Sequence, residues 1–178
     1  MRARDPAAVV QALKLRTVLP ANWRSGLTEA AERGVFVTPA VGGWVFAVGP
    51  DLRGASPDVG GFVAPLLERL SAAFEEAAWF ATDSAAEQHG WALARHGELV
   101  RGYAFDGGNG HVFWHGEVTD AERALQCFVD DPRDQSDDDV KWWPDERIVL
   151  ALAGAWSLDP ARLGEARSPA GVGWFGRC

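Results

Sequence analysis

The chain has 178 residues, of which 47% are hydrophobic and 24% charged; these proportions predict one folded domain over residues 1–178. The formal net charge is −8 and the Lys and Arg residues are scattered. This pattern argues against nucleic acid or an anionic membrane as a partner, because both need concentrated cations. Cys127 and Cys178 are too few for a secreted disulfide scaffold, and no apolar signal core follows the charged first residues. We therefore expect a cytoplasmic protein.

The first part of the chain is predicted to hold two helices and two strands. Residues 5–13 begin with Asp-Pro, which is typical of a capped helix, so a helix is predicted there. A second helix is expected from residue 22 or 25 to residue 33, where Gly34 ends it. Strands follow at 35–38 and 44–48, and the second is apolar on both faces, which predicts a covered central strand.

The middle of the chain predicts one helix followed by a sheet. Apolar residues recur at helical spacing over 62–74. Four consecutive strands are then expected, at residues 79–82, 90–95, 99–105 and 111–115. Short turns such as His96-Gly97 join them, so the pairing should be antiparallel. Alternation along the third of these strands places Leu99, Arg101, Tyr103 and Phe105 on one face.

The last part of the chain returns to helices. A capping-box pattern, Thr119 to Glu122, opens a short helix that ends at Phe128. An acidic stretch with six aspartates follows over residues 130–139, then a helix over 144–156, then a Gly-rich tail at 168–178 that we expect to be irregular. The predicted fold class is α+β: an antiparallel meander sheet of about five or six strands, with helices packed on one face and at the ends.

Strings that suggest cofactor or metal chemistry lack the context that this chemistry requires. The G-x-G-x-x-G string at 171–176 has no helix after it to receive a pyrophosphate. His115-Gly-Glu117 has no P-C-x-x-C pair downstream to complete a zinc site, and His111 lies roughly 13 Å from His115 along one strand. The aspartate stretch lacks the Gly and Glu of a calcium loop. The sequence therefore predicts no catalytic set, no metal and no cofactor.

Acidic and aromatic residues next to each other predict a protein-binding surface. Concentrated negative charge would attract a basic partner, and exposed tryptophans are frequent interface anchors. The predicted partner-binding residues are Asp137, Asp138, Asp139, Trp142 and Trp143.

Two alternatives remain open. The first is a small-molecule pocket between helix and sheet, with these candidate residues: Asp83, His89, Trp91, Arg101, Tyr103, Trp114 and His115. The second is a small enzyme that uses His89 with Asp83, or His115 with Glu117, as a polar pair.

The meander region resembles a group of small bacterial proteins. The resemblance is carried by Trp79-Phe-Ala-Thr-Asp83, His89-Gly-Trp91, Arg101-Gly-Tyr103, Gly110-His-Val-Phe-Trp114 and Gly116-Glu117, and it extends over roughly half of the chain. Such proteins are similar to the stand-alone immunity proteins that accompany secreted bacterial toxins. The resemblance implies binding to a protein partner, such as a basic toxin domain, and blocking of that partner. It implies no catalytic residue.

Overall fold

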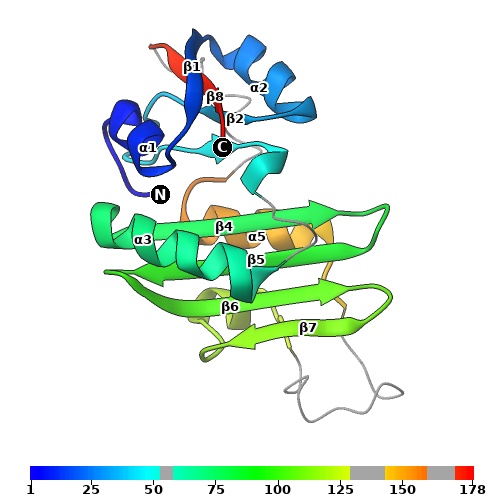
Figure 1. Cartoon of the computed structure of the whole chain (residues 1–178). Helices are drawn as coiled ribbons and strands as arrows, with labels where there is room; N and C mark the ends of the chain where they lie inside the picture. Colours follow the sequence, from blue (N-terminus) through cyan, green and yellow to red (C-terminus); the bar gives the residue numbers. More distant parts are fainter. Residues whose placement is uncertain (53–57, 129–142, 160–170) are drawn as a thin grey trace.

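The structure, a computed structural model, describes residues 1–52, 58–128, 143–159 and 171–178. Two antiparallel four-stranded sheets lie one above the other in Figure 1. The helices are α1 (Pro6–Ala12), α2 (Trp23–Glu32), η1 (Pro50–Leu52), η2 (Val59–Val63), α3 (Ala64–Phe74), α4 (Asp120–Ala124) and α5 (Glu146–Trp156). The strands are β1 (Arg16–Ala21), β2 (Val35–Val37), β3 (Ala47–Val48), β4 (Glu76–Asp83), β5 (Gln88–Arg95), β6 (Glu98–Asp106), β7 (Gly110–His115) and β8 (Gly173–Arg177).

The predicted α+β class and the antiparallel meander are confirmed. Strands β4, β5, β6 and β7 pair in chain order, with Trp91 opposite Tyr103 and Tyr103 opposite Trp114. The meander has four strands, because the strands at 35–37 and 47–48 belong to the other sheet. Helix α3 covers one face of the meander and α5 lies behind the opposite face (Figure 1), so helices pack on both faces.

The tail that we expected to be irregular contains β8. This strand pairs with both β1 and β2 and lies between them in the sheet order β1-β8-β2-β3. A Cβ atom on Gly173 would lie 2.5 Å from a ring carbon of Phe36. Glycine is therefore required at this position by a close approach of neighbouring strands, whereas we had taken the glycines as a sign of irregular chain.

Strand β3 lies at a sheet edge, which corrects the expectation of a covered central strand at 44–48. Val45 is nonetheless fully buried. It packs in the same cluster as Val63 and Leu67, which lie on the face of the meander that α3 covers. Its apolar character therefore reflects contact between the two sheets. The other edge of this sheet is β1, where Pro20 is compatible with pairing because edge strands tolerate proline.

A β-bulge in β6 corrects the predicted strand faces. Leu93 pairs with Arg101, and the next residue of β5, Ala94, pairs with Leu99. Val100 is thus an extra residue, and the alternation of faces restarts after it. Leu99 therefore packs with Ala94 in the cluster on the α3 side, opposite to Arg101, Tyr103 and Phe105.

A second shift of register, in the β6–β7 pairing, places His111 and His115 in different surroundings. Phe105 pairs with His111, whereas Ala104 pairs with Phe113. The imidazole of His111 consequently lies beside Tyr103, while His115 forms a hydrogen bond with the carbonyl of Leu99.

None of the described helices combines the length and the apolar character needed to cross a bilayer.

Candidate functional site

An ion pair without solvent exposure lies on the α5 side of the meander. Arg101 of β6 donates from Nε to both carboxylate oxygens of Glu122 in α4, at 2.8 and 3.1 Å. Both side chains are 0% exposed. Burial lowers the pKa of Arg101, and the Glu122 carboxylate opposes this shift. Two charges removed from water in this way need each other, because either one alone would be strongly destabilising.

Glu122 also accepts hydrogen bonds from two other parts of the chain. The indole Nε1 of Trp91, on β5, donates to it at 2.8 Å. The backbone N–H and the hydroxyl of Thr119 both donate to its Oε2 at 2.7 Å, which completes the predicted capping box at the start of α4. One carboxylate therefore holds two strands of the meander and the beginning of a helix together.

The Arg101 guanidinium packs against the aromatic ring of Trp114. Its Nη1 donates to the carbonyl oxygens of His115 and Gly116, at 2.9 and 3.3 Å. The guanidinium carbon lies 4.1 Å from the ring centroid of Trp114, a cation–π contact. Its Nη2 has no hydrogen-bond partner within the part of the chain that the structure describes.

Aromatic rings extend this cluster along β5, β6 and β7. The ring of Tyr103 lies 4.6 Å from Trp91 and 4.8 Å from Phe128, centroid to centroid. Its hydroxyl lies 2.6 Å from Nδ1 of His111. Burial raises the pKa of Tyr103 and lowers that of His111, so both groups are held in their neutral forms at pH 7.

Four of the seven predicted pocket residues are therefore together: Trp91, Arg101, Tyr103 and Trp114. They pack against each other, and Trp91, Arg101 and Tyr103 are 0% exposed. His115 lies apart from them on the exposed side of β7, with Nε2 2.9 Å from the carbonyl oxygen of Leu99. The geometry is that of a closed, hydrogen-bonded core.

The other predicted pocket residues, Asp83 and His89, lie at the end of the sheet where β4 turns into β5. Nδ1 of His89 is 2.9 Å from the hydroxyl of Thr82, and one oxygen of Asp83 accepts from the backbone N–H groups of Ala85 and Ala86. Burial lowers the pKa of His89, although nearby carboxylates raise it. A hydroxyl partner for His89 and a turn-capping role for Asp83 are sufficient structural reasons for both residues.

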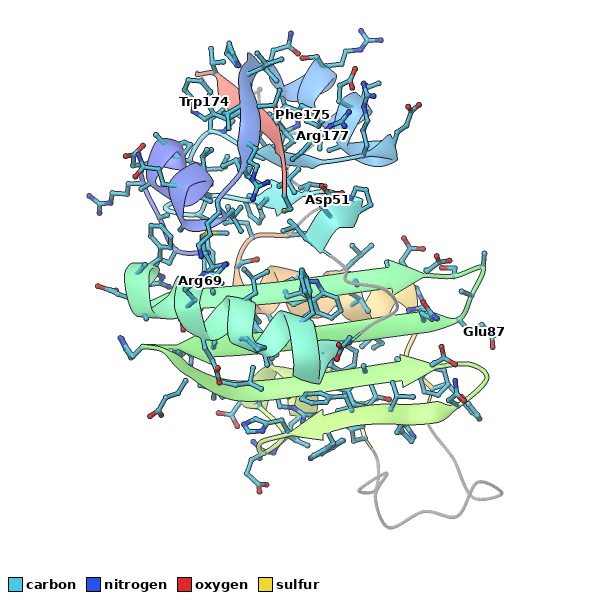
Figure 2. All side chains as sticks on the ribbon, viewed as in Figure 1. Asp51, Arg69, Glu87, Trp174, Phe175 and Arg177 are labelled. Atoms are coloured by element: carbon cyan, nitrogen blue, oxygen red, sulfur yellow. The ribbon has the colours of Figure 1, made fainter. Side chains whose placement is uncertain are left out.

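Carboxylates gather at this same end of the meander. The residues are Asp83, Glu87, Asp106, Asp145 and Glu146, and we call this group the acidic rim. Four of them act electrostatically on His89, and the fifth, Asp106, accepts from Nε2 of Gln88 at 2.8 Å. Figure 2 shows Glu87 projecting away from the sheet at the β4–β5 turn. Arg147, on α5, donates to Asp145 at 2.8 Å.

Trp143 stands beside the acidic rim, directly before α5. Its ring meets Phe105 edge to face, with 5.3 Å between centroids, and Phe105 pairs with His89 across the sheet. Trp143 is 57% exposed. A large apolar side chain is thus held in position by a buried ring while much of it faces solvent. The other predicted partner-binding residues, Asp137, Asp138, Asp139 and Trp142, lie outside the described residues.

Sequence reasoning missed Glu122 and His111 as members of the buried cluster. Glu122 was assigned only a capping role, but Arg101 on a covered strand face was a usable signal, because a buried cation requires an acceptor. The same argument applies to the hydroxyl of Tyr103, which requires a partner when buried. Which acceptor would be used depended on the register shifts, and these leave no clear trace in the sequence.

Over residues 1–52, 58–128, 143–159 and 171–178, no three His, Cys, Asp or Glu side chains are placed to hold a metal ion together. Comparison of the chain with protein-family models, with curated proteins and with solved structures finds no match.

Proposed function

We propose that this chain is a protein-binding module that docks a basic protein through Trp143 and the acidic rim. The observation that carries the proposal is the position of Trp143, which is 57% exposed and supported by the buried ring of Phe105. Tryptophans fixed in this way are typical anchors of interfaces, because little side-chain entropy is lost when a partner covers them.

Charge supports the same assignment. The rim contributes five carboxylates, one of which, Asp145, is paired with Arg147, in a chain with a net charge of −8. The pKa of Asp106 is lowered by hydrogen bonds from Gln88 and Asn109, and that of Asp145 by the backbone N–H of Ile148 and by Arg147. Both carboxylates are therefore ionised at neutral pH, and they would accelerate encounter with a basic surface.

In its more specific form, the proposal is an immunity protein that acts in the cytoplasm by covering the active site of a cognate bacterial toxin. This form relies on the resemblance of the meander region. The alternative of a pocket at Trp91, Arg101 and Tyr103 has less support, because these side chains have no exposed surface.

The test measures association and dissociation rates with the protein encoded by the neighbouring gene. Trp143→Ala should mainly raise the dissociation rate, by about 30-fold for an anchor worth about 2 kcal/mol. The double variant Glu87→Gln/Glu146→Gln should mainly lower the association rate and weaken its salt dependence. A matched control, Glu29→Gln/Glu32→Gln, removes the same charge from α2.

The control variant should reduce the association rate less than the rim variant, because α2 packs against the other sheet. Equal effects of the two double variants would show that only net charge matters, and would remove the rim from the interface. An unchanged dissociation rate for a folded Trp143→Ala protein would remove the anchor. In either case the surface proposed here would be wrong.

A further inference from the structure

A groove lined mainly by apolar side chains lies between the two sheets. The cavity has a volume of about 520 Å³. One wall is the chain around β3, with Trp44, Phe46, Ala47 and Val48; the other is the outer edge of β4, residues 78–82; Leu66, Leu67 and Leu70 of α3 also contribute. None of the described residues that line it carries a charged side chain, and the N-terminal amine of Met1 also belongs to the lining. We call this cavity the seam groove; β4, whose residues 78–82 line it, is the strand of the meander that lies nearest the other sheet in Figure 1.

The β4 wall presents backbone groups to the groove. The carbonyl of Glu76 accepts from the backbone N–H of Arg2, so it points away from β5. Backbone groups of alternate residues in a strand point to the same edge. The N–H and C=O groups of Ala78 and Phe80 therefore face the groove. Within the described part of the chain, no other backbone group forms a hydrogen bond with these N–H and C=O groups.

The protein already bridges the two walls at one end of the groove. The backbone of Met1 exchanges hydrogen bonds with that of Val45, at 3.1 and 3.0 Å. The next residue, Arg2, donates to Glu76 of β4 at 3.0 Å. Residues 1 and 2 thus form a short extended segment that is bonded to both sides, and the groove continues from this segment along the same two walls.

We propose that the seam groove binds an extended, apolar peptide segment of a partner protein, which adds to β4 as a further strand. Backbone groups repeating every two residues match another extended backbone, and the apolar walls would receive alternate side chains. Exposed strand edges usually carry charges or prolines that prevent such pairing. The edge Ala78-Trp79-Phe80-Ala81 carries neither. This site is separate from Trp143 and the acidic rim and does not depend on their proposed function.

The experiment selects decapeptides that bind the whole chain from a displayed random library and measures their dissociation constants. Ala78→Pro replaces the N–H that faces the groove by the ring carbon Cδ, and an edge strand tolerates this. We expect the selected peptides to bind this variant about fivefold more weakly, the effect of one lost hydrogen bond. The matched control Ala78→Val keeps the N–H and adds similar bulk, and it should bind within about twofold of wild type, since no hydrogen bond is lost. Thermal melting confirms that both variants are folded.

Amide hydrogen exchange provides a second readout. Bound peptide should slow exchange at Ala78 and Phe80, and Trp143→Ala should leave peptide affinity unchanged. A library that yields no saturable binder overturns the proposal, as do peptides that bind Ala78→Pro and wild type equally. Decanoic acid is tested in parallel. If it binds saturably and no peptide does, the groove is a site for small apolar molecules and the strand proposal is wrong.

Discussion

Replacing Glu122 by Gln should strongly destabilise the protein although it changes few atoms. The carboxylate accepts from Arg101, Trp91 and Thr119, and an amide has only one oxygen to accept with. The guanidinium of Arg101 would remain buried without its counter-ion. Removing one partner of a buried ion pair costs about 3–5 kcal/mol, a large part of the roughly 5–15 kcal/mol by which domains are stable.

Chemical denaturation measures this free energy, and thermal melting provides a second measure. For a chain of this size the midpoint should fall by roughly 6–20 °C, at about 2–4 °C per kcal/mol. Glu117→Gln, on the exposed segment before α4, is the control and should stay within about 0.5 kcal/mol of wild type. Adding Arg101→Met to Glu122→Gln should recover part of the loss, because the uncompensated charge is then gone.

Two results would refute this reasoning. The first is a Glu122→Gln protein that unfolds within about 1 kcal/mol of wild type, since breaking a buried pair costs more than that. The second is a double variant whose destabilisation equals the sum of the two single losses, which would mean that Arg101 and Glu122 are not energetically coupled.

Three further outcomes are expected. Gly116→Ala should destabilise more than Gly110→Ala in denaturation, because both residues have positive φ (72° and 73°) but only at Gly116 would a Cβ meet a backbone atom, at 2.1 Å; equal losses would contradict this. At pH 8 the native protein should react with a thiol reagent at Cys178 and not at Cys127, whose pKa burial raises to about 12, and labelling of both thiols in the mass spectrum would contradict the buried environment. Burial lowers the pKa of His111 below its usual 6.5, so the unfolded chain binds the proton more readily and the unfolding free energy should fall as the pH drops through about 6.5. This fall should be smaller in a His111→Gln variant.

The meander was predictable from the sequence because its information is local. The turn at His96-Gly97 and the alternation through Tyr103 identify neighbouring strands without knowledge of the rest of the chain. The buried cluster was only partly predictable. Arg101 and Tyr103 were placed on one face of their strand. Glu122, however, comes from a helix that begins after β7, and nothing in the capping pattern indicates that its carboxylate reaches a strand.

The first sheet was predicted less well because its pairings are long-range. Two of its strands, β1 and β8, were not predicted: Pro20 in β1 and the glycines of β8 are unfavourable for strands in isolation. Their pairing with each other, for example Leu19 with Phe175, decides their structure. Propensity within a short window does not contain that information.

The position of β8 also imposes an order on folding during synthesis. The strands of the meander are joined by short turns, and all four have been made once residue 115 has left the ribosome. Strands β1 and β2 are made earlier, but each pairs with β8, which spans Gly173–Arg177. Translation therefore produces a nascent chain in which the later sheet can close first, while β1 has no partner in its sheet and β2 can pair only with β3. During that interval their unpaired edges are exposed to other chains, so ribosome pausing between residues 115 and 173 is the period in which this protein is most exposed to aggregation.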